Sequence, residues 1–572
     1  MKKNISKYLS VFTTALLVLG TTGCKKSFLD KKPDGSVAAQ QYFKTDAQVI
    51  GTTDFLYNKV WFDYVQKAYY NVIEGMAGNL LAPSWDAEFL PFASNDASPR
   101  VLEVWRSLFA VVAQSNQIKG DIEKYAGEAV TPAVKNSAIG ECVFMRAMAY
   151  YQLVQLFGNV PLYDKDLVSI SDPKLHNINS AWKFIIRDLK KAVELLPTTS
   201  TIPGRVNKWA AKAMLAKAYL TYAGFVSTAP GTRDQSYLDS AALYSNEVIL
   251  SNAYTLVPAY KDLFLMQNNI NTESVVGLQY RFNGEYGMKN VLQAFLAFSS
   301  PQITGTWDGW GGDIGGTYEL ISKYDPADNR RKYTFFYAGE HYSDFRWNPA
   351  KDGTTIVDMQ VPVNTTNNMA TGEQNIKANR RAWVKKYVYG GPWDNNGKID
   401  AMNTGGVVYL LRLPEVYYTY ADAILGNNAS TADATALSYV NKMRQRAGLS
   451  NLSSITEDIL LNERRLEFPV EAQYWYDLMR LYYYKPGKVT KMLNDQLHGQ
   501  DQYYIKPNAE TFATVWSVVY DPSTNGGVPT KNLTRFNEDN NRDNDPKIYL
   551  PIPAAEKASA PFLNQPPVDF VF

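Results

Sequence analysis

The sequence predicts a mainly α-helical protein, built from helical hairpins, with a loop-rich region of short strands inserted between them. Apolar residues recur at three- and four-residue intervals over long stretches, which is typical of helices with one buried face. A stretch in the middle of the chain is instead rich in Gly, Asn, Trp and Tyr. With 572 residues, of which 45% are hydrophobic and 20% charged, we expect a large globular protein of two or more domains or subdomains.

The N-terminus has the three parts of a secretory signal peptide. Lysines near the start precede an apolar run over 11–19, and small residues follow it. This run is shorter than the roughly 20 apolar residues that span a bilayer as a helix. Cys24 comes directly after the small residues, where a bacterial lipoprotein precursor is cleaved and acylated, although Thr21 replaces the usual Leu. We therefore expect a lipoprotein signal over 1–23 and a lipid on Cys24; an ordinary signal peptide with an incidental cysteine is the alternative.

Four helices are predicted after the N-terminal segment. They cover Asn136–Phe157, Ala181–Leu196, Lys208–Tyr222 and Leu238–Leu250. Small Ala residues lie one turn from large aromatic residues in them, as in tetratricopeptide pairs, although no strict 34-residue consensus repeats. We interpret these helices as degenerate tetratricopeptide-like hairpins. Cys142, the only cysteine besides Cys24, falls in the first of them and is expected to be buried as a small hydrophobe.

Further helices are predicted at Val407–Leu425, Ala432–Ala447 and Ile459–Tyr484, with Pro469 interrupting the last. Between the two helical groups, alternating pieces at Ser274–Tyr280 and Arg381–Val388 predict short strands among loops. The predicted organisation is a signal over 1–23, an N-terminal part with the hairpin scaffold over 24–272, a loop-rich insertion over 273–405, and C-terminal helices with a terminal segment over 406–572. Loops on a rigid scaffold are where recognition usually resides.

Composition and motifs argue against several functional classes. The 58 Lys and Arg nearly balance the 56 Asp and Glu, and no basic stripe indicates nucleic-acid binding. The three His are far apart, and no nucleophile elbow or His-Glu-x-x-His helix indicates a hydrolase. Two stretches, Asp394–Asp400 and Glu538–Asp545, could hold a structural Ca²⁺, but neither has the EF-hand spacing, so we favour solvated turns. We expect no catalytic residues, no other metal and no cofactor.

Glu463 and Glu467 are four residues apart on one predicted helix face, a pattern that could suggest paired catalytic carboxylates. We instead predict a structural role, with Arg464 and Arg465 supplying the compensating charge. Arg412 and Glu415 are predicted to tie helix ends together in the same way.

Six segments, in order along nearly the whole mature chain, resemble the RagB/SusD family of outer-membrane nutrient-binding lipoproteins. They are CKKSFLD at 24–30, ECVFMRA at 141–147 with LFGNVPL at 156–162, NKWAAKA at 207–213, LRLPEVYY at 411–418, ERRLEF at 463–468 with WYDL at 475–478, and YLPIP at 549–553 with NQP at 564–566. The chain departs from the family at Thr21, at Pro414 and over 469–473. The resemblance implies a tetratricopeptide-like α fold and a lipoprotein exposed on the cell surface. It also implies capture of glycans, or in some members peptides, for a SusC-like TonB-dependent transporter barrel.

Two aromatic segments are the candidate ligand site, because the apolar face of a sugar ring stacks on an indole while polar side chains bind its hydroxyls. Trp307, Asp308 and Trp310 lie among glycines that we expect to leave the rings uncovered. Trp85 and Asp86, with Asn79 upstream, form a second aromatic and polar group, and the resemblance suggests ligand contacts in both regions. The alternative is that these Trp cap helical hairpins as core. The Trp residues predicted to be core are Trp105, Trp182, Trp209 and Trp475.

A surface binding protein is therefore the expected function, and not an enzyme. A helical scaffold with only protein partners and a secreted glycoside hydrolase are the alternatives, since two catalytic acids need no fixed spacing. The exposed Trp and Gly of the insertion favour ligand binding over a pure scaffold.

Overall fold

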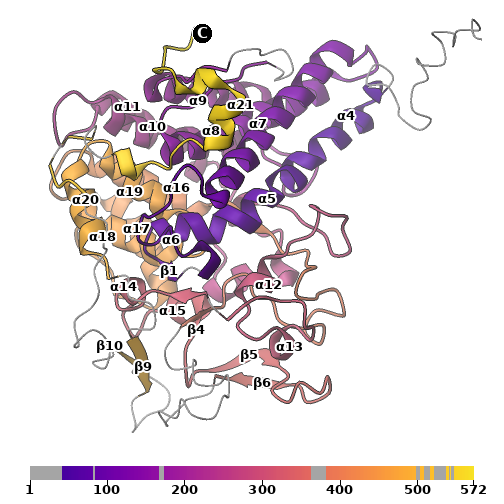
Figure 1. The fold of residues 1–572 in the computed structure, drawn as a ribbon, viewed down its shortest axis with the longest axis vertical. Helices are drawn as coiled ribbons and strands as arrows, with labels where there is room; N and C mark the ends of the chain where they lie inside the picture. Colours follow the sequence, from indigo (N-terminus) through magenta and orange to yellow (C-terminus); the bar gives the residue numbers. More distant parts are fainter. Residues whose placement is uncertain are drawn as a thin grey trace, which may run out of the picture.

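A computed structural model describes residues 42–81, 84–165, 173–312, 314–361, 382–497, 503–507, 516–520, 536–539, 541–542 and 546–572. Within these ranges the chain is mainly helical, and its strands form small sheets. Figure 1 shows the long helices together in the upper part of the molecule and the short helices and strands of the insertion below them. This confirms the predicted fold class. The signal and Cys24 lie outside the described residues.

Five long helices form the first half of the scaffold. They are α7 (Pro99–Tyr125), α8 (Pro132–Phe157), α9 (Ile178–Leu195), α10 (Lys208–Val226) and α11 (Gln235–Leu250), and each packs on the next. The last four are the predicted helices, and α7 adds to them. Their starts are set by side-chain caps, since Thr131, Asn177, Asn207 and Asp234 each accept a hydrogen bond from a first-turn N–H. Cys142 is buried in α8, as predicted.

The second helical group consists of α16 (Leu413–Leu425), α17 (Ala434–Ala447), α18 (Glu457–Glu467), α19 (Tyr474–Tyr482) and α20 (Pro486–Asp495). The helix predicted to begin at Val407 is wrong in its first residues, because Val408–Arg412 is strand β8, paired antiparallel with β2 (Ser274–Leu278). Every residue of β8 is buried, and an apolar run buried on both faces has no periodicity that separates strand from helix. Pro414 then occupies the first turn of α16, where proline is tolerated.

The predicted interruption at Pro469 is confirmed, because α18 ends at Glu467 and α19 begins at Tyr474. Two residues of the connection have left-handed backbone, Val470 at φ 66° and Ala472 at φ 53°. This is costly for a β-branched residue. The turn brings Glu471 to Arg412 and Lys386, and the Ala472 N–H to Glu74, so buried contacts hold it in place.

The N-terminal segment packs beside α7 and α8 and leads into the small sheets. Its elements are α4 (Asp46–Thr53), η1 (Asp54–Tyr57), η2 (Lys59–Trp61), α5 (Phe62–Tyr64), the π-helix η3 (Val65–Ile73), α6 (Glu74–Met76), β1 (Leu80–Leu81) and η4 (Ser84–Asp86). In the sheet order β1-β3-β7-β4, β1 forms one edge beside β3 (Gly315–Gly316), followed by β7 (Trp383–Val384) and β4 (Phe335–Phe336). The N-terminal segment thereby joins a sheet made otherwise from the insertion.

The remaining short elements surround this sheet or close the chain. They are η6 (Tyr260–Phe264), η7 (Met266–Asn268), α12 (Leu292–Leu296), α13 (Ser300–Ile303), α14 (Tyr318–Ile321), α15 (Arg330–Thr334), the pair β5 (His341–Trp347) and β6 (Val357–Gln360), the pair β9 (Tyr503–Pro507) and β10 (Trp516–Tyr520), η10 (Pro546–Ile548), α21 (Ala554–Ser559) and η11 (Pro561–Asn564). The predicted strands at Ser274–Tyr280 and Arg381–Val388 correspond to β2 and β7.

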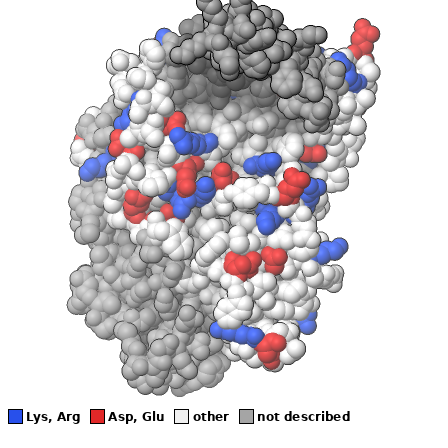
Figure 2. All heavy atoms as spheres, turned by 45° about the vertical axis from the view of Figure 1, so that its right-hand side comes forward, with Lys and Arg blue, Asp and Glu red and all other residues white. Residues whose placement is uncertain are grey.

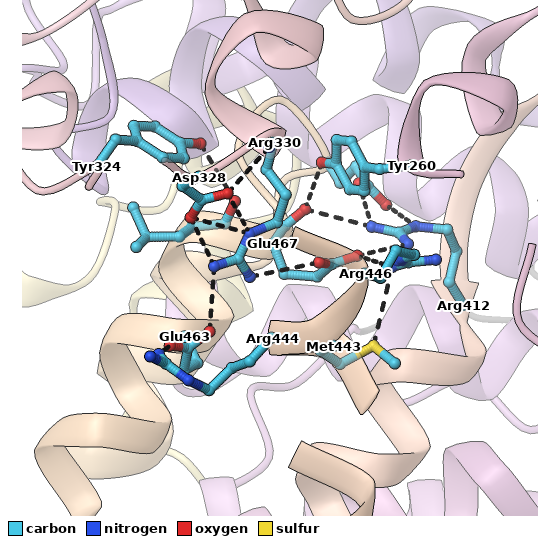
Figure 3. A network of polar contacts seen from close by, with 12 residues as sticks. Tyr260, Tyr324, Asp328, Arg330, Arg412, Met443, Arg444, Arg446, Glu463 and Glu467 are labelled. Atoms are coloured by element: carbon cyan, nitrogen blue, oxygen red, sulfur yellow. Dashed lines mark hydrogen bonds and ion pairs between the residues drawn. The ribbon is translucent and has the colours of Figure 1, made fainter. Parts of the chain in front are cut away.

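A buried ionic network ties the insertion to the C-terminal helices (Figure 3). The Glu467 carboxylate is fully buried and lies 2.9 Å from an Arg412 guanidinium nitrogen, 2.7 Å from one of Arg446 and 3.5 Å from one of Arg330. Glu463 pairs with Arg330, at 3.1 Å, and with Arg444. Burial alone would raise the pKa of Glu467, but the three Arg charges outweigh it and lower the pKa to about 2. The structural role predicted for both glutamates is confirmed.

The predicted partners of these glutamates are wrong. Arg464 binds Glu415 and Asp477, and Arg465 binds Asn79 and Glu319. Neighbouring helical residues point in different directions, so an arginine one residue after Glu463 cannot face it. The predicted tie of helix ends is confirmed, since Arg412, just before α16, pairs with Glu467 at the end of α18, and Glu415 in the first turn of α16 pairs with Arg464 of α18.

Candidate functional site

Pairing of β1 with β3 joins the two predicted aromatic segments. In this antiparallel pair Leu81, the last residue of β1, pairs with Gly315, the first residue of β3. The segment that leads to Trp85 and the segment that comes from Trp310 therefore meet at the same end of the two strands. Segments far apart in the sequence therefore lie at one end of the same ladder. All three predicted site Trp are exposed: Trp85 by 51%, Trp307 by 78% and Trp310 by 50%. The alternative that they are core is wrong for all three.

Trp310 packs against a row of aromatic rings. Its ring centroid lies 5.2 Å from that of Phe295 in α12, and Phe295 lies 5.4 Å from Tyr70 in the π-helix η3. Tyr70 is buried, and burial, followed by the charge of Asp86, raises the pKa of its hydroxyl. The row therefore ends near Asp86 in η4, the element that also carries Trp85. The row holds Trp310 with one face on protein and leaves part of the ring to solvent.

Trp307 lies in the same loop and has charged groups near it. The Lys351 ammonium is 5.7 Å from its ring centroid, and the exposed Asp308 carboxylate accepts a hydrogen bond from Thr306. The Thr306 hydroxyl also accepts a hydrogen bond from the N–H of Ala401, the residue after Asp400, and burial, and secondly the charge of Asp308, raise the pKa of Asp400. The ring therefore has carboxylates, a hydroxyl and an ammonium near it, which are groups that bind sugar hydroxyls.

The glycines of this loop have a different role from the predicted one. A Cβ on Gly311 would collide with the carbonyl oxygen of Ala297, and one on Gly309 would collide with the Ser300 side chain. The Trp310 N–H also donates to the Ala294 carbonyl, at 2.6 Å. Glycine is needed so that the loop can lie against the backbone of α12 and α13, and the rings are exposed because the loop is held in this way.

Two predicted ligand residues, Asp86 and Asn79, are buried and already bound. Asp86 accepts hydrogen bonds from Arg100, at 2.9 Å, and from Asn71, and burial raises its pKa. Asn79 donates to Glu74 at 2.9 Å and accepts from Arg465 at 2.9 Å. Both predictions are therefore wrong: these two side chains are bound within the protein and are not available to a ligand.

Tyr286 is a candidate that sequence reasoning missed. It is 71% exposed, and its ring centroid lies 4.9 Å from that of Phe62 beneath it. Its loop reaches the Trp307 loop through the 400–404 turn: the Asn283 N–H donates to Asn403 at 2.8 Å, and the Ala401 N–H donates to Thr306 at 3.4 Å. With 39 Tyr in the chain, only flanking glycines at 284 and 287 could have distinguished this one.

The predicted core Trp residues divide differently. Trp105, Trp182 and Trp475 are buried, as predicted. Trp209 is only partly buried, so that prediction is wrong. It lies in the first turn of α10, where the Lys212 ammonium is 5.1 Å from its ring centroid.

In the described part of the chain no group of three His, Cys, Asp or Glu side chains is arranged to hold a metal ion. At one of the two predicted turns, Asp394 is bound by Arg346 at 2.6 Å. The other, Glu538–Asp545, lies partly outside the described residues. Figure 2 shows acidic and basic side chains intermixed over the described part of one face. None of the described helices has the length and apolar character that crossing a membrane requires.

Comparison with known proteins agrees with this architecture. The model of the SusD family matches residues 230–568, and a model described as "Starch-binding associating with outer membrane" matches residues 27–220. A SusD-like protein from Bacteroides ovatus is 33% identical, with 99% of this chain and 98% of that protein covered. The protein therefore belongs to the SusD family.

Solved structures show the same fold. A crystal structure with a xylogluco-oligosaccharide is 31% identical, with a TM-score of 0.77 over 92% of this chain and 99% of that one. The surface glycan-binding protein A from Bacteroides thetaiotaomicron, solved with laminarihexaose, has a TM-score of 0.61 at 19% identity, covering 90% of this chain and 96% of that one. At that identity the second likeness concerns the fold alone.

Proposed function

We propose that the protein binds glycan chains on the surface formed by Trp85, Trp307, Trp310 and Tyr286. The observation that carries this proposal is the exposure of three Trp rings from two segments that β1 and β3 bring to one place. Exposed indoles offer flat apolar faces to the C–H faces of sugar rings. The carboxylates of Asp308 and Asp400 supply partners for the hydroxyls at the ring edges.

A related protein supports a glycan rather than a peptide ligand. The structure crystallised with a xylogluco-oligosaccharide shares the fold over nearly the whole chain at 31% identity. A glycan is thus the first ligand to test, and a xylogluco-oligosaccharide is the probe. Peptide capture is the alternative that the same experiment can detect.

Binding without turnover is the expected result. Isothermal titration of the purified protein with a xylogluco-oligosaccharide, with other glycan oligomers and with peptides in parallel should give saturable heat with at least one glycan. The same mixtures, incubated and assayed for new reducing ends, should release none. Turnover would contradict the binding function. Peptide binding without glycan binding would show that the ligand is a peptide.

We further propose that the protein is a lipoprotein of the outer membrane that delivers its ligand to a TonB-dependent transporter. The name of the family model matched over 27–220 supports the location, and family membership supports the transporter. Co-purification from detergent-solubilised outer membranes tests the partner. Absence of any β-barrel transporter from the purified material would favour a protein without this partner.

Replacement of Cys24 by Ala should abolish lipid attachment. The thiol is the only group at the predicted cleavage point that can carry the acylglyceryl chain, and one protein surface without acyl chains binds a bilayer weakly. Metabolic labelling with a fatty-acid analogue measures the effect. Cys142→Ala is the matched control and should keep the label, since that thiol is buried in α8. Label retained in Cys24→Ala would place the lipid elsewhere.

A further inference from the structure

Among the described residues, Glu74 is the one buried carboxylate that has no basic side chain within ion-pair distance. It is fully buried and accepts hydrogen bonds from two neutral donors, the Asn79 side-chain amide at 2.9 Å and the Ala472 N–H at 2.7 Å. An uncompensated buried charge is costly, so this carboxylate gains stability by binding a proton. The other buried carboxylates, each paired with an arginine or a lysine, are Asp86, Glu141, Asp188, Glu273, Asp328, Glu340, Glu415, Asp422, Glu463, Glu467, Glu471 and Asp477.

The titratable groups that face Glu74 come from several elements and leave its charge uncompensated. Lys386, two residues after β7, is bound at 2.8 Å by Glu471 of the 468–473 connection, so these two charges offset each other. Tyr64 of α5 and Tyr69 of η3 stay neutral, because burial raises the pKa of both hydroxyls. Burial likewise raises the pKa of Glu74 to about 7, although its two hydrogen bonds act in the opposite direction.

Glu74 directly follows η3, an element that positions both aromatic segments of the candidate site. Within η3, Tyr70 belongs to the aromatic row on which Trp310 packs, and Asn71 donates a hydrogen bond to Asp86 of η4. Figure 1 shows α6, which begins at Glu74, and β1 between the long helices and the short elements of the insertion. A change at Glu74 therefore occurs where the helical scaffold meets the site.

Through Asn79, Glu74 also holds the pairing of β1 with β3. The Asn79 amide nitrogen is directed to Glu74 and its side-chain oxygen to Arg465, at 2.9 Å each, so the amide has one orientation. The Asn79 carbonyl accepts from the Thr317 N–H at 3.0 Å, and the Thr317 hydroxyl donates to the Gly78 carbonyl at 2.7 Å. These contacts connect the residues just before β1 with the residue just after β3.

A proton on Glu74 would weaken this arrangement. Hydrogen bonds to an ionised acceptor are roughly twice as strong as those between neutral groups. Protonation removes that charge from the bonds to Asn79 and to Ala472, and so loosens β1 and the 468–473 connection together.

We propose that proton binding at Glu74 loosens the hold on η3 and β1 and thereby weakens glycan binding, so that pH regulates the site. This inference rests on the glycan-binding function proposed above. Coupling between two binding events is reciprocal. If a proton on Glu74 weakens glycan binding, a bound glycan must in turn displace that proton.

The experiment is calorimetric titration of the full chain with a xylogluco-oligosaccharide at pH 8 and pH 5.5. We expect an affinity at least about fivefold lower at pH 5.5. At pH 7, titration in two buffers that differ in their heats of ionisation should show release of a fraction of a proton on binding. Glu74→Gln keeps the side-chain shape but cannot ionise. It should bind with the low-pH affinity at both pH values and release no proton.

Glu141→Gln is the matched control. Burial also raises the pKa of Glu141 to about 7, but this residue lies in α8 and pairs with Arg205 at 2.8 Å. The control should keep both the pH dependence and the proton release, and thermal unfolding checks that both variants are folded. Equal affinities of the unmodified chain at the two pH values, or a pH dependence that persists in Glu74→Gln, would overturn the inference.

A measurement without ligand separates this inference from the proposed function. Trp fluorescence of the unmodified chain should change between pH 5.5 and pH 8 with a midpoint near 7, and Glu74→Gln should lack that change. Absence of glycan binding at every pH would contradict the proposed function. Identical fluorescence titrations of the two chains would overturn the role of Glu74, whether or not a glycan binds.

Discussion

Replacing Trp310 by alanine is expected to weaken glycan binding about thirtyfold, equivalent to ~2 kcal/mol, with little loss of stability. The ring is half exposed, and only its inner face packs on Phe295. Trp85→Ala and Trp307→Ala should act in the same direction. Since Trp307 contacts less protein than Trp310, its replacement should change the melting temperature least. Titration calorimetry and thermal unfolding of each variant measure the two effects together.

Two controls separate a binding effect from a folding effect. Trp310→Phe keeps a flat ring and should retain much of the affinity that Trp310→Ala loses. Trp475→Ala removes a ring that is fully buried, and it should cost roughly 3–5 kcal/mol of folding free energy. A lowered melting temperature with unchanged affinity in all three site variants would eliminate the aromatic surface as the binding site.

Replacing Glu467 by glutamine should cost about 3–5 kcal/mol of folding free energy. The change keeps the shape of the side chain but removes the charge that Arg330, Arg412 and Arg446 share in the buried network. Three guanidinium groups would then have less compensation in a site closed to water. Urea unfolding followed by circular dichroism gives the free energy of unfolding.

Lys119 and Glu123 provide the matched control, because they form an ion pair that is partly exposed to solvent, whereas the pairs of Glu467 are buried. Glu123→Gln should change the free energy of unfolding by less than about 1 kcal/mol. If Glu467→Gln stays within that same range, the network does not contribute to stability as described.

The same network predicts an acid sensitivity. The pKa of Glu467 is lowered in the fold from its ordinary value of 4.5 to about 2, so the unfolded chain binds a proton more readily. The stabilisation from this group is therefore fully present above about pH 4.5 and is lost as the pH falls toward 2. Comparing the free energies of unfolding of the unmodified chain and Glu467→Gln between pH 7 and pH 3 tests this: the difference between them should shrink as the pH falls.

Most of the long helices after α7, the interruption at Pro469 and the family could be predicted from the sequence. These depend on patterns within a few residues, such as apolar periodicity, caps and proline, or on short segments in a characteristic order. Trp85, Trp307 and Trp310 could also be predicted as exposed residues, since they lie in loops and not on the apolar face of a predicted helix.

The tertiary structure alone decided which neighbours of those rings are available to a ligand. Asp86 and Asn79 are buried by Arg100 and Arg465, which come from other parts of the chain. The β8 strand, the partners of Glu463 and the exposure of Tyr286 likewise depend on what packs against each segment. Local residue patterns carry no information about such distant contacts, because burial and pairing are properties of the folded chain as a whole.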